Sequence, residues 1–203
     1  DRSGGIDEYN RHAITKLSNI HFTTTKNSKK RVIKMGEDPK FVFNTGSLAI
    51  DNIKNNVSLK SDIEKKMKLK LLGDEIILIQ HPITTQVELV EKQIDNTLDA
   101  IIKLKKRTIM ISPNSDAGSD IILNKLKKYS QELDYLNFYN SLPRCDFLGL
   151  LKHCGVLVGN SSSGIAEASY FSIPVVNIGI RQFGRERGTN VIDVKVGQVN
   201  RIE

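Results

Sequence analysis

The residues best suited to chemistry form one short turn, Gly159-Asn160-Ser161-Ser162-Ser163-Gly164 (the serine turn), which follows the apolar run 156–158. An apolar run that ends in glycine and small polar residues is typical of a buried parallel strand that leads into a helix. The first amides of such a helix have no partner inside the helix, so they attract an anion, most often a phosphate. The pattern therefore predicts a phosphate site at this turn.

Several side chains could complete this phosphate site. Ser161, Ser162 and Ser163 carry hydroxyl donors, and Gly164 would let a ligand approach the backbone closely. Glu167 lies one turn further on, where its carboxylate could meet the hydroxyls of a ribose. The alternative is an ordinary serine-capped helix in an α/β domain, and the turn alone does not decide between the two.

A second group of residues could neutralise the charge of a phosphate. Arg181, Arg185 and Arg187 lie in the segment 181–188 (the arginine segment), whose glycines predict a flexible loop. The planar guanidinium group donates paired hydrogen bonds to phosphate oxygens. A solvated run of charge is the alternative, but three arginines after an apolar strand favour contact with the same ligand.

The chain after residue 73 alternates short apolar runs with amphipathic stretches. The predicted strands are 75–80, 108–112, 136–139, 156–159, 173–178 and 190–194. Helical spacing between them is clearest for Val90, Ile94, Leu98 and Ile101. Strands that alternate with helices indicate a parallel sheet, so the predicted fold class is α/β, a Rossmann-like three-layer domain.

In such a sheet, ligands bind outside the carboxyl ends of the strands. Polar or glycine-containing clusters follow five of the predicted strands, at residues 80–82, 113–119, 141–144, 160–163 and 179–182. Because the strands are parallel, we expect these clusters to gather at one edge of the sheet. A binding site at that edge is therefore favoured over five unrelated loops.

These loops contain further candidate ligand contacts. His81 could donate to a phosphate or act as an acid, with a hydrogen-bonded loop histidine as the alternative. Asn114 and Asp116 could bind ligand hydroxyls, or could cap the helix that follows them. Phe147 or Leu148 could form an apolar wall for a base ring, or could lie in the core.

The residues before this regular pattern predict a smaller group of elements. They are a helix at 7–20, a strand at 21–23, a basic helix at 28–35 and a strand at 41–46. The first helix places Ile14, Leu17 and Ile20 on one stripe, which we expect to face inward. Asp7 and Arg11 are four residues apart and share a face of that helix, which by itself predicts only a surface ion pair.

Composition and charge limit the classes of function. The chain has 203 residues, of which 39% are hydrophobic and 26% charged, and its net charge is +7. We expect no nucleic-acid partner, because the lysines are scattered along amphipathic helices and no nucleic-acid motif is present. A positive balance suits a nucleotide diphosphate equally well. We expect no membrane association, because no apolar run approaches the ~20 residues of a span and no secretory signal is recognised.

The sequence gives no sign of a metal or cofactor. Cys145 and Cys154 match no zinc spacing, and we expect them to be free thiols in the cytoplasm. No Cys–His pair, Ser–His–Asp pattern, dinucleotide fingerprint or P-loop is present. The residues alone therefore predict an α/β domain that binds an anionic ligand, in the first instance a nucleotide diphosphate, and they leave the reaction open.

Four blocks of the sequence resemble the hydrolysing UDP-N-acetylglucosamine 2-epimerases of bacterial sialic- and legionaminic-acid biosynthesis. They are residues 6–17; 35–39 with 43–46; 80–82 with 113–119; and 159–188. The most specific are Asn160-Ser161-Ser162-Ser163-Gly164-Ile165 and Arg181-Gln182-Phe183-Gly184-Arg185-Glu186-Arg187-Gly188. The resemblance therefore extends over nearly the whole chain.

This resemblance implies two Rossmann-like domains that face each other, the glycosyltransferase-B architecture. Residues 1–52 would be the end of the N-terminal domain, and residues 53–203 the UDP-binding C-terminal domain. The implied reaction eliminates UDP across C1–C2 of the sugar and then adds water to the glycal. The products would be UDP and N-acetylmannosamine, or its 2,4-diacetamido relative. The implied partners are the UDP-sugar and UDP, a homo-oligomer being left open.

The resemblance also implies roles for individual residues. Asp7 would be a catalytic carboxylate near the sugar, with Arg11 as its neighbour, and His81 would contact the diphosphate. Ser162, Ser163 and Gly164 would hold phosphate and Glu167 the ribose. Together with the residues singled out above, the candidate substrate-binding set is Asn114, Asp116, Phe147, Ser161, Ser162, Ser163, Gly164, Glu167, Arg181 and Arg185.

The chain departs from complete family members at both ends. Such members carry a full N-terminal Rossmann domain with a phosphate-contacting arginine loop and further acidic catalytic residues, and also a C-terminal crossing helix. We therefore expect the 203-residue chain to bind UDP weakly and not to turn over UDP-N-acetylglucosamine. The alternatives are a UDP-sugar glycosyltransferase and a non-catalytic module that binds a nucleotide sugar.

Overall fold

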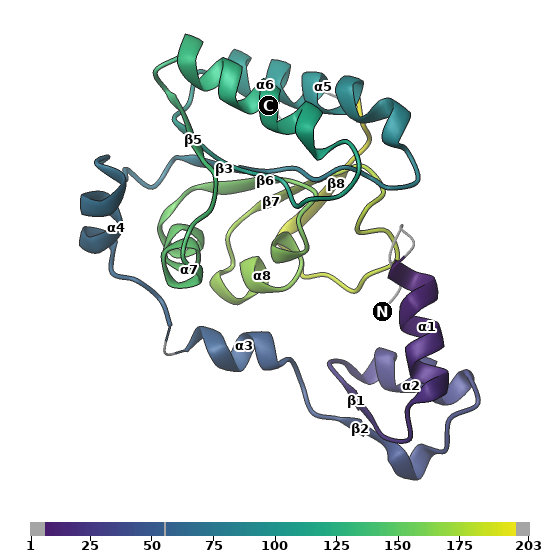
Figure 1. Cartoon of the computed structure of the whole chain (residues 1–203). Coiled ribbons are helices and arrows are strands. Elements are labelled where there is room, and N and C mark those ends of the chain that lie inside the picture. The colour runs from purple at the N-terminus through teal and green to yellow at the C-terminus, as the bar shows by residue number, and fades with distance from the viewer. Residues whose placement is uncertain (1–6, 55, 198–203) are drawn as a thin grey trace.

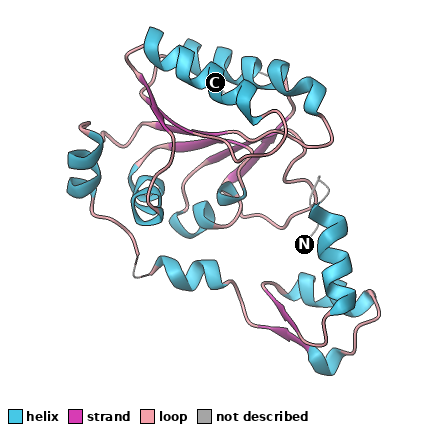
Figure 2. Cartoon of the chain, in the orientation of Figure 1, coloured by secondary structure: helices cyan, strands magenta, loops and turns pink. Residues whose placement is uncertain are grey.

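The computed structural model describes residues 7–54 and 56–197 of the chain. It contains two parallel sheets, one of two strands and one of six, which lie in separate parts of the molecule (Figures 1 and 2). Within the described ranges, no helix is long and apolar enough to cross a membrane.

The first sheet belongs to a small N-terminal unit, residues 7–44. Its elements are α1 (Asp7–Leu17), β1 (His21–Thr23), α2 (Lys26–Lys34), the 3-10 turn η1 (Pro39–Phe41) and β2 (Val42–Asn44). The strands β1 and β2 pair in parallel, with His21 opposite Val42. The predicted order of helix and strand is confirmed, but α1 ends three residues earlier than expected.

The predicted inward stripe of α1 is wrong. The side chains of Ile14, Leu17 and Ile20 are 62%, 86% and 53% exposed, because no element in the described part of the chain covers this face. Helical spacing grouped Ile14 and Leu17 on one side of the helix, and Ile20 lies beyond its end. The spacing contained no information about whether a partner lies against that side.

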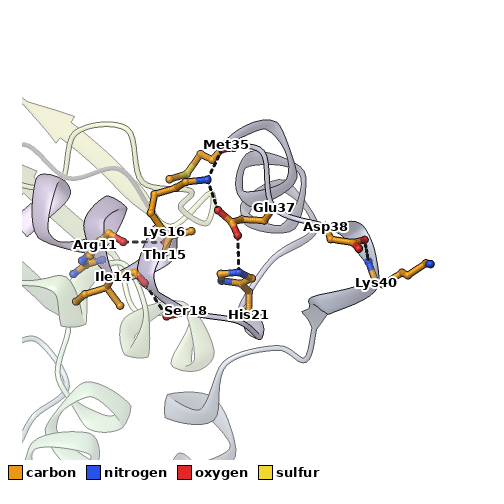
Figure 3. A network of polar contacts seen from close by, with 10 residues as sticks. All are labelled: Arg11, Ile14, Thr15, Lys16, Ser18, His21, Met35, Glu37, Asp38 and Lys40. Atoms are coloured by element: carbon orange, nitrogen blue, oxygen red, sulfur yellow. Dashed lines mark hydrogen bonds and ion pairs between the residues drawn. The ribbon is translucent and has the colours of Figure 1, made fainter.

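The N-terminal unit is held together by the carboxylate of Glu37 (Figure 3). Lys16 Nζ donates to Glu37 Oε1 at 2.6 Å and to the carbonyl of Met35 at 3.1 Å. The ring Nε2 of buried His21 lies 3.2 Å from Glu37 Oε2. The hydrogen bond from Lys16 is the main reason why the pKa of Glu37 is lowered. Residues 35–37, part of one of the family-like blocks, thus connect α1 to β1 and to the end of α2.

The second sheet is built from six parallel strands. They are β3 (Ile76–Ile79), β4 (Thr108–Ile111), β5 (Leu136–Tyr139), β6 (Val156–Gly159), β7 (Val175–Ile178) and β8 (Val191–Val194). Their order in the sheet is β5-β4-β3-β6-β7-β8, and every neighbouring pair is parallel. The six strands predicted from apolar runs are all confirmed.

Helices cover both faces of this sheet. The described elements around it are α3 (Leu48–Ile53), α4 (Lys60–Met67), η2 (Val87–Leu89), α5 (Val90–Leu104), α6 (Ser119–Glu132), α7 (Arg144–His153), η3 (Ser162–Gly164) and α8 (Glu167–Phe171). Figure 1 shows α5 and α6 on one face and α7 and α8 on the other. The predicted α/β three-layer class is therefore confirmed.

The side chains of β3 explain why the sheet is buried on both faces. Ile76 and Leu78 pack into the apolar cluster that contains Leu98 of α5, whereas Ile77 and Ile79 belong to the cluster beneath α7 and α8. Alternate residues of a strand point to opposite faces, so a central strand covered on both sides must be apolar throughout. The sequence Ile-Ile-Leu-Ile meets this requirement.

The strand order creates one topological switch point (the crevice) at the carboxyl edge of the sheet. The chain runs outward from β3 to β5, returns to β6 beside β3, and then runs outward in the opposite direction to β8. Loops that follow β3 and β6 therefore diverge, and ligands of open α/β sheets bind at such a switch point. The register places Ile79 opposite Gly159, so the 80–82 loop and the serine turn begin side by side.

The predicted domain boundary between residues 52 and 53 falls inside α3. Ile53 is fully buried in the cluster beneath α7 and α8, so the end of α3 already packs on the six-stranded part. Lys66 of α4 pairs with both carboxylate oxygens of buried Asp146 at 2.9 Å, and Ser58 Oγ donates to the same side chain at 2.5 Å. Burial alone would raise the pKa of Asp146, but these hydrogen bonds outweigh it and lower the pKa. The boundary itself stays a prediction.

Candidate functional site

Gly159 ends β6 at the centre of the crevice. Its φ is +132°, and a Cβ placed on it would lie only 1.9 Å from the carbonyl oxygen of Ile79. Only glycine fits this close approach of the β6 backbone to β3. The next amide, Asn160 N–H, donates to that same Ile79 carbonyl at 3.1 Å.

Asn160 connects the strand ends of the site. Its side-chain Oδ1 accepts the backbone N–H of His81 at 2.7 Å, and its Nδ2 donates to the carbonyl of His81 at 2.9 Å. Its own carbonyl accepts Gln182 Nε2 at 2.8 Å and Arg181 Nη1 at 3.2 Å. One buried asparagine therefore positions residues that follow β3 and β7. Sequence reasoning misses this role, although Asn160 is the first polar residue after a buried strand.

His81 is positioned as a neutral hydrogen-bond donor. Its Nδ1 accepts the backbone N–H of Asn114 at 2.9 Å, so the proton of the neutral ring lies on Nε2. Burial, and then the nearby positive charge of Arg181, lowers the pKa of His81 to about 4. At neutral pH the ring thus offers an N–H without a charge, which favours the phosphate-donor interpretation over the acid.

Asn114 and Asp116 do not cap the helix that follows them. The N-cap of α6 is Gly118, which has φ +88° and on which a Cβ would lie 3.1 Å from the side chain of Val90. The Nδ2 of Asn114 donates instead to Asp116 Oδ2. The Oδ1 of Asn114 is buried and has no donor among the described residues, so the capping alternative is wrong and an unused acceptor remains beside His81.

The serine turn differs from the predicted helix start. Residues 162–164 form the 3-10 turn η3, and α8 begins only at Glu167. The amide of Gly164 donates to the Ser161 carbonyl at 3.1 Å, and the Ser163 amide lies 3.3 Å from Ser161 Oγ. The Gly164 amide, and more weakly the Ser163 amide, are thus already used within the turn, and a phosphate site at the turn stays a prediction. What the turn presents outward is chiefly the exposed Ser162 and the half-buried Ser163.

Gly164 is explained by packing. It is buried, and a Cβ on it would meet the side chains of Val175 and Leu157 at 3.0 and 3.1 Å. Glycine at this position therefore allows the turn to pack closely on β6 and β7. This packing, and not space for a ligand, explains why residue 164 is a glycine. Contact between the Gly164 backbone and a phosphate stays a prediction.

Gln182, a buried residue whose role no sequence motif predicts, binds two other side chains of the arginine segment. Gln182 Oε1 accepts Arg185 Nη1 at 3.0 Å, and the Gln182 carbonyl accepts Arg187 Nη2 at 2.7 Å. Arg187 also pairs with Asp193 of β8. Three side-chain contacts thus connect the segment to the ends of β6 and β8: Arg181 and Gln182 donate to Asn160, and Arg187 pairs with Asp193. The flexibility of the loop stays a prediction. The position of Gln182, an uncharged amide within a segment of arginines, is the sequence signal that could have indicated this structural role.

The remaining candidates lie on the α7 and α8 side of the crevice. Glu167 is the first residue of α8, and its carboxylate lies 3.4 Å from Arg144 Nη2 at the start of α7. Phe147 is half-buried against the core, whereas Leu148 is fully buried. Of the two predicted base-wall residues, only Phe147 therefore keeps an accessible surface.

The predicted catalytic residues belong to two parts of the chain, Asp7 and Arg11 to α1 and His81 to the loop after β3. His81 lies at the switch point with Asn160 and Arg181, as described above. Arg11 is half-buried on α1, and Asp7 begins that helix, but the Asp7 side chain lies outside the described residues. The described contact between the N-terminal unit and the arginine segment is made by Glu186, whose carboxylate accepts hydrogen bonds from Thr25 and from Asn27.

A cavity of about 840 Å³ lies next to the arginine segment but apart from the serine turn. It opens between η2, α5 and the ends of β7 and β8, and its walls include Lys92, Phe183, Arg187, Asp193 and Lys195. None of residues 159–164 lines it. Among the described residues, including those of this cavity, no three His, Cys, Asp or Glu side chains are arranged to hold a metal.

The fold and the site define a Rossmann-like domain of the glycosyltransferase-B type, with polar and cationic side chains at the switch point of the sheet. The family model described as UDP-N-acetylglucosamine 2-epimerase matches residues 1–202. The chain belongs to the UDP-N-acetylglucosamine 2-epimerase family, which confirms the resemblance found in its sequence.

Two curated relatives illustrate the similarity. The chain is 42% identical over 195 residues to the polysialic acid biosynthesis protein P7 of Escherichia coli, covering 94% of the chain and 49% of that protein. It is 36% identical over 200 residues to the GDP/UDP-N,N'-diacetylbacillosamine 2-epimerase (hydrolyzing) of Campylobacter jejuni, covering 97% and 52%. The chain thus spans about half the length of the curated relatives that it matches.

Solved structures agree on the fold. The UDP-GlcNAc 2-epimerase of Methanocaldococcus jannaschii, in complex with UDP-GlcNAc and UDP, matches with a TM-score of 0.73 at 17% identity. The match covers 96% of this chain and 55% of that one. At this identity, the likeness supports the arrangement of elements alone, and it confirms the predicted architecture.

Proposed function

We propose that this chain carries the UDP-binding half of a hydrolysing UDP-N-acetylglucosamine 2-epimerase, and that UDP lies at the carboxyl ends of β3 and β6. The observation that carries the proposal is the contact set of Asn160, which holds His81, Gln182 and Arg181 around the switch point. The family membership supports it, and so do the two relatives, one a polysialic acid biosynthesis protein and the other a hydrolysing diacetylbacillosamine 2-epimerase. A cytoplasmic location, where we expect both thiols to be reduced, belongs to the same proposal.

Each part of UDP has a candidate partner in this arrangement. The diphosphate would accept hydrogen bonds from Ser162, Ser163 and the Nε2–H of His81, and the guanidinium of Arg181 would neutralise its charge. The carboxylate of Glu167 would accept the ribose hydroxyls. Since His81 is neutral, it directs the ligand by hydrogen bonding, and charge compensation depends on the arginines.

Further predicted contacts complete the substrate site. Phe147 would form the apolar wall for the uracil ring, and Asn114 Oδ1, which lacks a donor in the described chain, would accept a donor from the substrate or a water. Asp116 would position Asn114 through their hydrogen bond, and Arg185 would support the arginine segment.

The proposed reaction divides between the two parts of the chain. A base removes the proton from C2 of the sugar, the C1–O bond to UDP breaks, and a C1–C2 double bond forms. Water then adds across that bond and gives the epimeric free sugar. Asp7, with Arg11 beside it, is the proposed carboxylate near the sugar, while the switch-point residues stabilise the charge that develops on departing UDP.

The central test is calorimetric titration of UDP into the purified 203-residue chain. Arg181→Ala should weaken binding about 10- to 100-fold, because it removes a charge-assisted contact to phosphate. Asn160→Ala should weaken it to a similar extent by releasing His81 and the arginine segment. Asn124→Ala, on an exposed position of α6, is the matched control and should bind like the parent chain.

Turnover separates the proposal from its alternatives. We expect the full-length protein to release free N-acetylmannosamine, or the 2,4-diacetamido sugar, from the UDP-sugar without an acceptor, and the 203-residue chain to bind UDP without turnover. A product that requires an acceptor would select a glycosyltransferase, and UDP-sugar binding without any product would select a binding module. Failure of the 203-residue chain to bind UDP at millimolar concentration would overturn the proposed site.

A further inference from the structure

Glu186 lies in the middle of the arginine segment but interacts with the N-terminal unit. The hydroxyl of Thr25 donates to Glu186 Oε2, and Asn27 Nδ2 donates to Glu186 Oε1 at 2.7 Å. Both carboxylate oxygens are therefore bound by residues that lie far away in the sequence. The contact joins the start of α2 to the arginine segment.

The start of α2 is suited to receive a carboxylate. Thr25 is the N-cap of this nine-residue helix, and its hydroxyl oxygen also accepts the Ser28 amide at 3.0 Å. The helix has no acidic residue in its first turn, and its sequence, Lys-Asn-Ser-Lys-Lys-Arg-Val-Ile-Lys, is strongly basic. An anion at a helix N-terminus is stabilised by the helix dipole. Glu186 supplies from the arginine segment the negative charge that α2 itself lacks.

On its other side, Glu186 is connected to the switch point. Its neighbours Arg185 and Arg187 both donate to Gln182, and Gln182 donates to the carbonyl of Asn160. A continuous series of contacts thus leads from α2 through the arginine segment to Asn160. A change at one end can alter the placement of Arg181, which donates to the same Asn160 carbonyl.

We propose that Glu186 is a positioning residue that anchors the arginine segment on the start of α2, so that docking of the N-terminal unit and binding of UDP strengthen each other. This inference rests on the proposed function, because UDP is the ligand that the segment would hold. Coupling between two binding events is reciprocal. If UDP binding strengthens the docking of the N-terminal unit, loss of the anchor must therefore weaken UDP binding.

The first experiment measures UDP affinity in the 203-residue chain. Glu186→Gln, which keeps the shape but removes the charge, should weaken UDP binding about 3- to 10-fold, the range for an exposed charge-assisted contact. Thr25→Val should weaken it similarly, whereas Thr25→Ser, which retains the hydroxyl, should restore the parent affinity. Glu132→Gln, an exposed carboxylate of α6, is the matched control and should leave the affinity unchanged.

A double-mutant cycle identifies the mechanism. If Glu186 acts through α2, Asn27→Ala should weaken UDP binding in the parent chain but have almost no further effect in the Glu186→Gln background. A purely structural role would lower the thermal midpoint of each variant and leave the UDP affinity of all of them at the parent value. That outcome, or strictly additive effects on affinity, would overturn the proposal.

A second measurement does not depend on UDP. Hydrogen exchange of residues 25–28 and 181–188 should be faster in ligand-free Glu186→Gln than in the parent chain, and unchanged exchange would overturn the anchor. The exchange could also become faster as expected while the parent chain binds no UDP. That result would support the anchor, but it would overturn both its coupling to UDP and the proposed function. The two failures are therefore distinguishable.

Discussion

The six-stranded part and the N-terminal unit differ in how far their apolar side chains are covered. Leu98 of α5 and Ile77 of β3 are fully buried between helices and sheet, whereas Tyr9, Leu17 and Phe22 of the N-terminal unit are largely exposed. Phe22 stacks on Phe43 at a centroid distance of 5.8 Å, but this pair is itself exposed. The proposed UDP contacts therefore lie on a part of the chain with a well-buried apolar core. Asp7, the proposed carboxylate near the sugar, lies on a unit that buries few apolar side chains.

Because of this difference, the two halves of the proposed site should respond differently to mutation. Residues around the switch point are held by a packed sheet, so damage to that core should remove ligand binding together with folding. The N-terminal unit is held mainly by polar contacts such as those of Glu37 and Glu186. Damage there should change the unit locally and leave the sheet intact.

The largest effect is expected for Gly159→Ala. The new Cβ would collide with the backbone of Ile79, and the positive φ would add strain, so we expect a loss of about 4 kcal/mol in the free energy of unfolding. Urea denaturation of the variant measures this loss. A variant as stable as the parent chain would show that β3 and β6 do not approach each other as described.

A pair of leucine variants tests the contrast directly. Leu98→Ala should lower the free energy of unfolding by about 3 kcal/mol, because it leaves a cavity between α5 and the sheet. Leu17→Ala, on the exposed face of α1, should change it by less than about 0.5 kcal/mol. Equal losses in urea denaturation would contradict the difference in packing between the two parts.

His81 gives the six-stranded part a specific pH dependence. Its pKa is about 4 in the folded chain and near 6.5 when the ring is unperturbed, so between these values the unfolded state binds more protons. Stability should therefore fall as the pH is lowered, by about 2 kcal/mol from His81 between pH 7 and pH 5. The difference in stability between the parent chain and His81→Gln should shift by that amount over this range. Parallel pH profiles would show that the ring is not buried as a neutral group.

The smallest effect on the ligand site is expected for Glu37→Gln. This change removes the charge that pairs with Lys16 and reduces the contact with His21. Protease cleavage within residues 7–44 should become faster, while UDP affinity should stay at the parent value. A marked loss of UDP affinity would mean that the N-terminal unit contributes more to the site than Glu186 alone provides.

Much of the fold could be predicted from local patterns. The apolar runs of β3 to β8 are readable because a strand covered on both faces must be apolar along its whole length. The position of the site followed from the same pattern, since the polar clusters after parallel strands must share an edge. His81 and Arg181 were predicted in this way, and the structure places both at Asn160.

The errors concern residues whose role depends on a distant partner. Asn160 and Gln182 act through backbone groups of other loops, and no local spacing reveals those pairings. Gly164 resembled a ligand-facing glycine, but the neighbours that require it are side chains of other strands. Periodicity correctly gave the apolar face of α1, yet whether that face is covered depends on elements elsewhere.

The pairing of β3 with β6 also has a consequence during synthesis. Ile76 lies opposite Val156, about 80 residues further along the chain, so the central pair of the sheet is a long-range contact. A ribosome that has made β3, β4 and β5 has not yet made Asn160, and the emerging polypeptide cannot form the ligand crevice. If UDP binds there as proposed, it can stabilise this chain only late in translation, after most of the apolar strands have already needed protection from aggregation.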